Sequence, residues 1–384
     1  MADVNIISPK FAENVQKAAN GFLPSGDDGS IDAFLASWNN FKSLLNKSVT
    51  AGSIFSNPIV STYSLVYMTS NAYQGGVLAP NGDIHFVPSF ANRGQKVNIF
   101  SGIVSTYSLI YTNTSGAYSQ GVLAANGDIH FIPNANSNRG QKINSNGVVS
   151  TYSLVYTNAA SAYGGGILSP NGDIHFIPGS TPVGQKVSSS GVVSTYSLVY
   201  SITLTNSVAY IGGILAPNGD IHFVPYNADR GQKISSSGIV STYSLIYTTG
   251  AAYQGGVLSP NGDIHFVPRS ANRGQKINSS GVVSTYSLVY TTANSYMGGV
   301  LSPNGDVHFV PCSANRGQKI NNSGVVSTYS LFYTTGLGYI GGILTPNGDI
   351  YLIQYSATIG QKISTTSALP FDIGTCCSSF LNKF

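Results

Sequence analysis

Charge is scarce in this chain of 384 residues. Asp, Glu, Lys and Arg make up 8% of it, and Glu13 is its single glutamate, whereas an ordinary soluble domain is about 25% charged. The net charge of +4 comes from only 18 basic and 14 acidic residues. Nucleic-acid binding needs clustered Lys and Arg, which the chain lacks, so we expect no nucleic-acid partner.

Long apolar runs are also missing. No segment approaches the roughly 18 apolar residues of a membrane-spanning helix, so no membrane span is expected. The N-terminus lacks the basic start and apolar core of a secretory signal, and three cysteines, Cys312, Cys376 and Cys377, cannot form a disulfide framework. The location stays open, but these absences favour a cytoplasmic or particle-associated (virion) protein.

The chain has a repeat instead. Asn-Gly-Asp occurs seven times between Asn81 and Asn347, at spacings of 43 to 47 residues, and Ser-Thr-Tyr-Ser and Gly-Gln-Lys also occur seven times each. In the copy that begins at Ala251, strands are predicted at 253–259, 263–268, 275–278 and 282–291, because Val, Thr and Tyr favour strands and Asn-Gly favours a tight hairpin with positive φ angles.

Four strands in about 40 to 45 residues are typical of one blade of a β-propeller. A β-solenoid, the alternative, usually has fewer residues per coil and fewer hairpins. The sequence therefore predicts an all-β fold, a seven-bladed β-propeller at 58–363, with a helical N-terminal extension at 1–57 and a C-terminal docking tail at 364–384. The array begins with a lone fourth strand, Val60 to Tyr67, which should pair beside Gln361 and close the ring.

The strings GGVLSPNGDIHFVP and GQKI resemble the repeats of seven-bladed propellers in the broad kelch and YncE-like group. The resemblance covers the seven repeats and not the two ends. It implies the fold but little about function, because propellers host many unrelated activities.

Length variation among the copies is concentrated in the connections between fourth and first strands and between second and third strands, although the third-to-fourth turn also changes once, near Phe100. These connections share one face of a propeller, and loops that tolerate change often carry binding. Phe90, Arg269 and Cys312 on this face also differ from blade to blade. An interrupted ring of Arg with aromatic residues could hold an anionic or glycan ligand, or each Arg could brace its own loop or a neighbouring blade. The candidate binding residues are Arg93, Arg139, Arg230, Arg273, Arg316, Tyr226 and Tyr355.

All six histidines follow an Asp by two positions, and Tyr351 replaces His in the seventh copy. The two-residue period of a strand places each Asp and His on the same face. They could bind metal or shuttle protons, but six copies favour a hydrogen-bonded structural network with the Ser and Thr of Ser-Thr-Tyr-Ser, similar to that of WD-type blades. The residues of this predicted network are Asp83, His85, Asp128, His130, Asp173, His175, Asp220, His222, Asp263, His265, Asp306 and His308.

The chain shows no nucleophile elbow, phosphate-binding loop or metal-ligand spacing. The sequence therefore predicts no catalytic residue, no metal and no cofactor, and a protein that is not an enzyme. An enzyme with its site in the central channel remains a third possibility.

The N-terminal segment shows apolar residues at helical spacing, and the anchor residues would be Phe34, Trp38, Phe41 and Leu45. Two short helices are too small for a domain, so they should dock on the propeller, on another copy or on a different protein. The leading expectation is a structural or interaction protein, anchored by its helices and tail to a protein assembly such as a virus or phage particle. The alternative is a lectin-like propeller with repeated glycan sites between blades.

Overall fold

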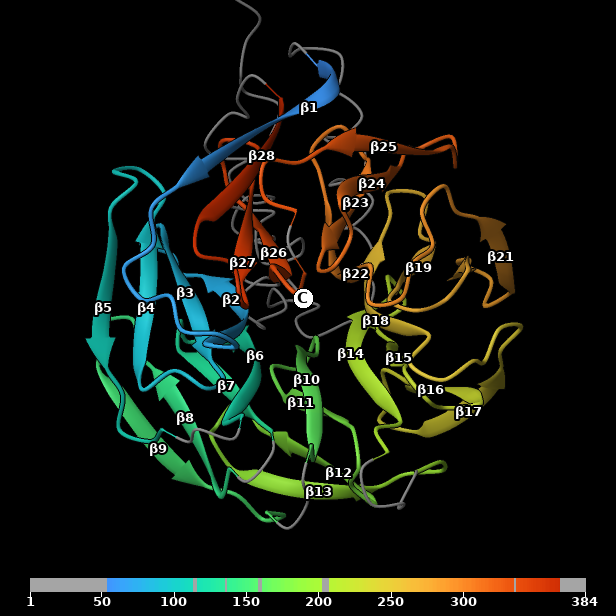
Figure 1. Ribbon diagram of the computed structural model, residues 1–384. Helices are drawn as coiled ribbons and strands as arrows, with labels where there is room; N and C mark the ends of the chain where they lie inside the picture. Colours follow the sequence, from blue (N-terminus) through green and yellow to red (C-terminus); the bar gives the residue numbers. More distant parts are fainter. Residues whose placement is uncertain are drawn as a thin grey trace, which may run out of the picture.

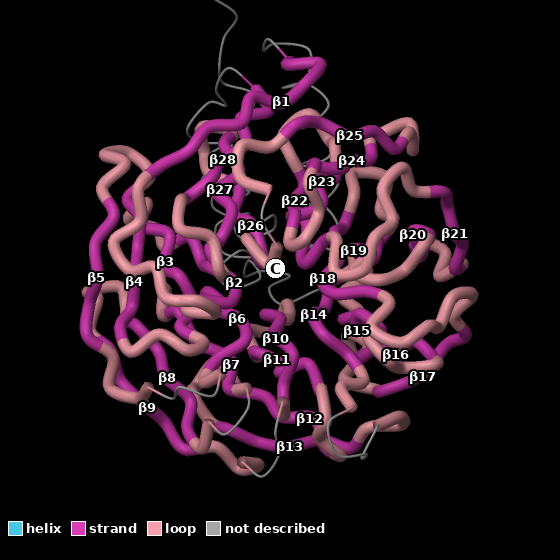
Figure 2. Tube along the Cα trace, viewed as in Figure 1, coloured by secondary structure: helices cyan, strands magenta, loops and turns pink. Residues whose placement is uncertain are grey.

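The computed structural model describes residues 54–366, apart from 113–115, 135–136, 158–160, 202–206 and 335. They form seven four-stranded antiparallel sheets arranged around a common axis (Figure 1). Within the described ranges the regular elements are all strands (Figure 2). The predicted seven-bladed β-propeller is therefore confirmed.

Each blade contributes one strand to each of four concentric positions (Figure 1). The innermost strands are β2 (Tyr73–Leu78), β6 (Tyr118–Leu123), β10 (Tyr163–Leu168), β14 (Tyr210–Leu215), β18 (Tyr253–Leu258), β22 (Tyr296–Leu301) and β26 (Tyr339–Leu344). The second strands are β3 (Asp83–Pro88), β7 (Ile129–Pro133), β11 (Ile174–Pro178), β15 (Ile221–Pro225), β19 (Ile264–Pro268), β23 (Val307–Pro311) and β27 (Asp349–Gln354).

The third strands are β4 (Arg93–Asn98), β8 (Arg139–Ile143), β12 (Val183–Val187), β16 (Arg230–Ile234), β20 (Arg273–Ile277), β24 (Arg316–Ile320) and β28 (Gly360–Thr366). The outermost strands are β5 (Val104–Ser108), β9 (Val149–Ser153), β13 (Val193–Ser197), β17 (Val240–Ser244), β21 (Val283–Ser287), β25 (Val326–Ser330) and β1 (Ile54–Tyr63). We number the blades one to seven from β2–β5 to β26–β28 with β1.

The first strand of the chain closes the ring. β1 pairs antiparallel with β28, and Thr62 lies opposite Gln361, as the sequence predicted. The pairing reaches Ile54 opposite Thr366, so residues 54–57 are strand and not part of a helical extension. Because β28 continues to Thr366, β1 has a pairing partner before its predicted start at Val60 and begins at Ile54. The rest of the extension, with Phe34, Trp38, Phe41 and Leu45, and the tail after residue 366 lie outside the described residues.

Alternation along the second strand builds the core. In blade five Ile264 and Phe266 are buried on one side, and Phe266 packs against the fully buried Tyr253 with ring centroids 5.8 Å apart. Adjacent blades pack so closely that a Cβ on Gly256 would lie 2.4 Å from Cδ1 of Ile214 in blade four. The blades therefore share their hydrophobic clusters with their neighbours, which explains why one copy cannot form a core alone.

The Pro-Asn-Gly turn differs from the predicted hairpin. Among its residues in blade five only Gly262 has a positive φ, of 86°, and its N–H donates to the carbonyl of Ser259 at 2.9 Å. Pro260 fixes its own φ near −65°, so the turn begins with ordinary negative φ angles and the left-handed conformation falls on the glycine.

A buried glutamine links each blade to the one before it. Gln275 in β20 is fully buried, and its Oε1 accepts the backbone N–H groups of Ile246 and Tyr247, which leave blade four, at 3.0 and 2.9 Å. The other six blades repeat this contact through Gln95, Gln141, Gln185, Gln232, Gln318 and Gln361. Gln95 receives the N–H groups that follow β1, so the same linkage spans the closure of the ring.

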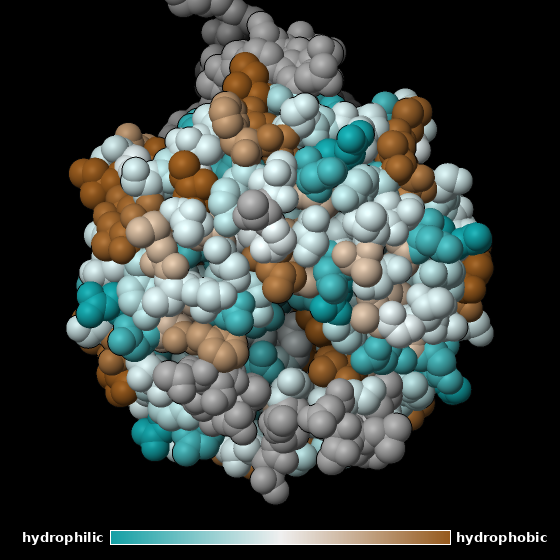
Figure 3. Space-filling view, in the orientation of Figure 1, coloured by the Kyte–Doolittle hydropathy of each residue, from teal (hydrophilic) through white to brown (hydrophobic). Residues whose placement is uncertain are grey.

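Antiparallel order sorts the connections onto two faces. The inner-to-second and third-to-outer turns lie at one end of each blade, which we call the turn face. The second-to-third and outer-to-inner connections lie at the other end, which we call the loop face. Hydrophobic side chains are exposed along the rim (Figure 3), for example Val282 and Val289, which flank β21.

Candidate functional site

Every blade holds one lysine–aspartate pair. In blade five Nζ of Lys276 lies 2.6 Å from a carboxylate oxygen of Asp263, whose side chain is 9% exposed. Nδ2 of Asn261 donates to the same oxygen at 3.2 Å. The equivalent pairs in the other blades have separations of 2.5 to 2.6 Å. The lysine of each Gly-Gln-Lys string therefore has its own carboxylate.

The histidine of the same strand face contacts a tyrosine. Nδ1 of His265 lies 3.3 Å from the hydroxyl of Tyr286 in β21, rather than against the Ser or Thr that the sequence analysis expected. Tyrosine reaches this position because its ring lies over Gly274, where a Cβ would be 2.0 Å from it. His85, His130, His222 and His308 make the same contact at 3.1 to 3.3 Å.

Burial lowers the pKa of His265 to about 4, helped by the charge of Lys276 and opposed by that of Asp263. The imidazole is therefore neutral near pH 7, with one ring nitrogen as a hydrogen-bond donor and the other as an acceptor. The structural role of the Asp and His residues stays a prediction. Among the described residues, no group of three or more His, Cys, Asp or Glu lies in an arrangement that could hold a metal ion.

The excess charge of the propeller lies on the loop face. After the seven lysine–aspartate pairs are set aside, the charged residues between 54 and 366 are six arginines and one aspartate, Asp229, an excess of five positive charges. All seven are in or directly after second-to-third connections. The arginines are Arg93, Arg139, Arg230, Arg269, Arg273 and Arg316.

Arginines at the start of third strands stack on tyrosines of the preceding blade. The guanidinium carbon of Arg273 lies 5.8 Å from the ring centroid of Tyr247, and the corresponding distances for Arg93, Arg230 and Arg316 are 5.2 to 6.0 Å. All four are exposed, as is Arg139 at the same position in blade two. Stacking on the flat face of a guanidinium leaves its N–H edge available to an acceptor.

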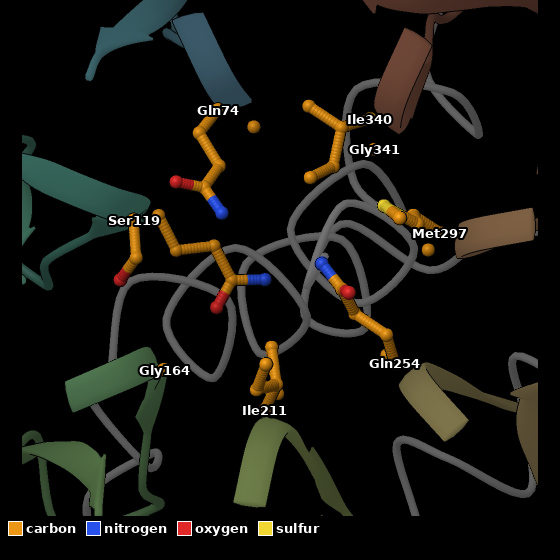
Figure 4. Close-up of a pocket in the computed structure, with 13 residues that line it drawn as sticks. Gln74, Ser119, Gly164, Ile211, Gln254, Met297, Ile340 and Gly341 are labelled. Carbon is orange, nitrogen blue, oxygen red and sulfur yellow. The ribbon is translucent and has the colours of Figure 1, made fainter. Parts of the chain in front are cut away.

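The sevenfold symmetry breaks at the channel. The residue after the first tyrosine of each innermost strand differs in most blades and lines a cavity of about 40 Å³ (Figure 4). This volume can hold water but is far below a typical ligand pocket. The residues at this position are Gln74, Ser119, Gly164, Ile211, Gln254, Met297 and Ile340.

The channel is narrow because the next residue is usually a glycine with positive φ. Gly255 has a φ of 77°, and a Cβ on it would lie 2.9 Å from Cα of Gly298 in the following blade. Blade two has Gln120 instead, and its Oε1 accepts the N–H of Gly166 at 3.2 Å. The sequence alone predicted no role for these positions, although their variation among aligned repeats could have identified them.

A second break in symmetry surrounds Arg269 on the loop face. This residue occupies the first position of its second-to-third connection, where the next blades have Cys312 and Tyr355 and the preceding blade has Tyr226. The guanidinium carbon of Arg269 lies 4.9 Å from the ring centroid of Tyr226. Cys312 is buried, and burial raises the pKa of its thiol to about 11, although the charge of Arg269 opposes this shift.

A polar pocket of about 150 Å³ lies between blades five and six at the turn face. Blade five contributes Ser259, Asn261, His265 and the Lys276–Asp263 pair to it, and blade six contributes the turn of residues 321–324. Such a lining offers donors and acceptors for a small polar ligand.

Comparisons with known proteins identify the fold only. No protein-family model and no curated protein matches the chain. A streptogramin B lyase superposes with a TM-score of 0.69 at 19% identity, over 81% of this chain and 99% of the lyase. This chain shares the lyase fold. The virginiamycin B lyase of Staphylococcus aureus, solved as a catalytically inactive histidine variant with quinupristin, gives 0.69 at 18% identity over 80% and 99% of the two chains. An extracellular domain of a two-component system from B. thetaiotaomicron gives 0.60 at 11% identity, over 83% of this chain and 44% of that one.

These comparisons correct the expectation that the protein is not an enzyme. That expectation was based on the absence of catalytic motifs, and it is overturned because this fold hosts enzymes: the lyases share it over 99% of their length. Repeated blades do not argue against an active site. The neighbours give no support to a virion or lectin role, and the kelch and YncE-like grouping remains a resemblance. No helix in the described part of the chain is long and apolar enough to cross a membrane.

Proposed function

We propose that this protein is an interaction protein whose loop face binds an acidic polysaccharide. The observation that carries the proposal is the distribution of charge. Seven lysines form ion pairs with seven aspartates inside the blades. Among the described residues, the six loop-face arginines have a single acid near them, Asp229, which forms an ion pair with Arg230 at 3.1 Å. One face is therefore cationic.

A repeating polymer suits a repeating face. The arginines of blades one, two, five and six each follow an exposed asparagine and begin a third strand. Asparagine bonds sugar hydroxyls, and the guanidinium edge bonds carboxylates or sulfates. One exposed contact contributes about 0 to 1 kcal/mol, but several contacts to one polymer act together through effective concentration.

Dextran sulfate and neutral dextran of the same length form the test pair. The full chain should bind dextran sulfate with an affinity that falls as salt rises, and neutral dextran should not compete. The triple variant Arg93→Gln, Arg273→Gln and Arg316→Gln removes about 2 kcal/mol, which is roughly 30-fold in affinity at low salt. Unchanged affinity in this variant would rule out the arginine ring.

Asn146→Asp is the matched control for a single Arg273→Gln substitution. Both variants lower the net charge by one, and Asn146 is exposed in a third-to-outer turn on the turn face. If the binding face is assigned correctly, only the Arg273 variant weakens binding. Equal weakening would mean that the polymer senses net charge alone. Binding of duplex DNA as tight as that of dextran sulfate would count against a polysaccharide partner.

The pocket between blades five and six favours a second candidate, a neutral sugar bound at the turn face. Asn322→Ala would remove one amide from its lining while leaving the lysine–aspartate pair intact. A neutral glycan that binds the full chain, and binds this variant at least tenfold more weakly, would support it. A glycan array with signals from acidic sugars only would exclude it.

A further inference from the structure

Arg269 differs from the ring of arginines in its surroundings. It begins the second-to-third connection of blade five, and its carbonyl accepts the N–H of Ser295 at 3.0 Å. Ser295 directly precedes β22, the innermost strand of blade six, so Arg269 lies beside the loop-face end of an innermost strand. The ring arginines begin the third strands and are exposed, whereas Arg269 is half-buried.

The guanidinium of Arg269 has aromatic neighbours, but no acid among residues 54–366 that the structure describes pairs with it. Its flat face stacks on the ring of Tyr226 at 4.9 Å, and its Nη1 donates to the hydroxyl of the same tyrosine. Its Nε is buried without a hydrogen-bond partner among the described residues. No carboxylate within those residues forms an ion pair with it, in contrast to Arg230 and every described lysine.

A partly desolvated cation without a counterion is unfavourable, and a bound anion would restore the lost interaction. Burial lowers the pKa of Arg269, although Cys312 and Tyr355 oppose this. Arginine stays charged in proteins, so its positive charge remains. The Nε also offers an oxygen of the anion a donor that no group in the described part of the chain uses.

Cys312 and Tyr355, which act electrostatically on Arg269, belong to an apolar cluster. Met297, Cys312 and Ile340 form one buried cluster, and Tyr355 packs against it. Met297 and Ile340 also line the channel, where Met297 lies across the opening from Ser119 (Figure 4). A ligand at Arg269 therefore meets a phenol ring from blade four and an apolar cluster from blades six and seven.

We propose that Arg269, with Tyr226 and Tyr355, forms a single binding site for a small aromatic or aliphatic anion at the loop-face end of the channel. The carboxylate or phosphate group would accept from the Arg269 guanidinium, and the apolar part would rest on the cluster of Met297, Cys312 and Ile340. This site goes beyond the proposed polysaccharide face, because it occurs in one blade and does not use the ring arginines.

Phenyl phosphate and benzoate are the probes, and inorganic phosphate tests whether the apolar part matters. Calorimetric titration of the full chain should give one equivalent bound, with phenyl phosphate and benzoate tighter than inorganic phosphate. A preference for phenyl phosphate over benzoate would identify a phosphate ligand, and the reverse a carboxylate. Absence of saturation at about 10 mM of both organic probes, which means dissociation constants well above about 1 mM, would overturn the proposal.

Arg269→Ser is the decisive variant, because blade one already has Ser89 at the equivalent position and the blade architecture accommodates it. It should weaken binding of the organic probes at least tenfold, and Tyr226→Phe should weaken it less because the ring remains. Arg273→Gln, which changes the charge equally in the same blade, should bind them normally. Equal loss in both arginine variants, or none in Arg269→Ser, would overturn the site.

Dextran sulfate separates this site from the proposed function. Arg269→Ser should still bind dextran sulfate nearly as well as the full chain, since five ring arginines remain. If dextran sulfate binding fails in the unmodified protein while phenyl phosphate binds with one equivalent, the polysaccharide proposal is wrong and the Arg269 site stands.

Discussion

Replacing Gln275 with Leu should test what holds neighbouring blades together. The side chain is fully buried and accepts two backbone N–H groups from the end of blade four, at 3.0 and 2.9 Å. Leucine has a similar volume and no acceptor, so the packing is nearly preserved while both donors lose their partner. The perturbation therefore removes two hydrogen bonds between blades, together with the buried Nε2 of Gln275, which has no partner among the described residues.

An unsatisfied buried donor costs about 1 to 3 kcal/mol. Ile246 and Tyr247 lie near the surface, where water can reach them in part, so the lower half of the doubled range applies, about 2 to 4 kcal/mol. The unfolding entropy near Tm is about 2.1 cal/mol/K per residue, or roughly 0.65 kcal/mol/K for the propeller. The expected fall in Tm is then about 3 to 6 °C.

Differential scanning calorimetry of the full chain measures this shift. Gln254→Leu is the control, because Gln254 lines the channel and accepts no backbone N–H recorded among the described residues. Gln95→Leu repeats the perturbation where the ring closes, since Gln95 accepts the N–H groups of Val66 and Tyr67 at 3.1 and 2.7 Å. If the Gln275 variant melts at the same temperature as the Gln254 variant, the linkage between blades is refuted. If the Gln95 variant melts like the unmodified protein, the same linkage does not stabilise the closure of the ring.

The buried histidines predict sensitivity to acid. Burial is the main reason that their pKa values are lowered to about 4, and to about 3 for His308. In the unfolded chain the histidines take up protons near their ordinary pKa of 6.5, before the folded protein does. The free energy of unfolding should therefore fall as pH drops from about 6.5 to 4. Urea midpoints that stay constant between pH 7 and 4.5 would contradict this. His265→Ala should lower stability by about 1 to 3 kcal/mol and leave ligand binding intact, and lost binding with unchanged melting would assign it a functional role. Gly274→Ala should lower the free energy of unfolding by about 3 kcal/mol, since its Cβ would meet the Tyr286 ring at 2.0 Å. Gly281→Ala, with open space around the Cβ and a φ of 80°, should lower it by about 1 kcal/mol. Equal melting temperatures of the two variants would show that the Tyr286 ring moves aside.

The repeat in the sequence predicted the main architecture. Seven copies of a four-strand pattern specify seven blades, because no copy can bury its own hydrophobic faces and each must stack on the next. The lone strand before the first copy and the three strands after the last predicted the closure, which β1 and β28 form. The same period explains why Asp263 and His265 share one face of β19.

Contacts between blades could not be predicted in the same way. Tyr286 was expected to be an ordinary strand residue, but it reaches His265 because Gly274 leaves room for its ring. Gln275 was visible in each Gly-Gln-Lys string, but its partners lie about 29 residues earlier in the chain, in another blade. Periodicity describes one strand at a time and does not specify such pairs.

The sequence by itself determined the blade, the number of blades and the face on which the connections vary, since these follow from local pattern and repeat count. Only the tertiary structure decided which charges remain unpaired. Lys276 and Asp263 are 13 residues apart and meet across two strands, and this repeated pairing leaves the loop-face arginines as the excess. The tertiary structure also placed Arg269 between Tyr226 and the cluster at Cys312, because residues about 43 positions apart become neighbours only when successive blades pack side by side in the ring.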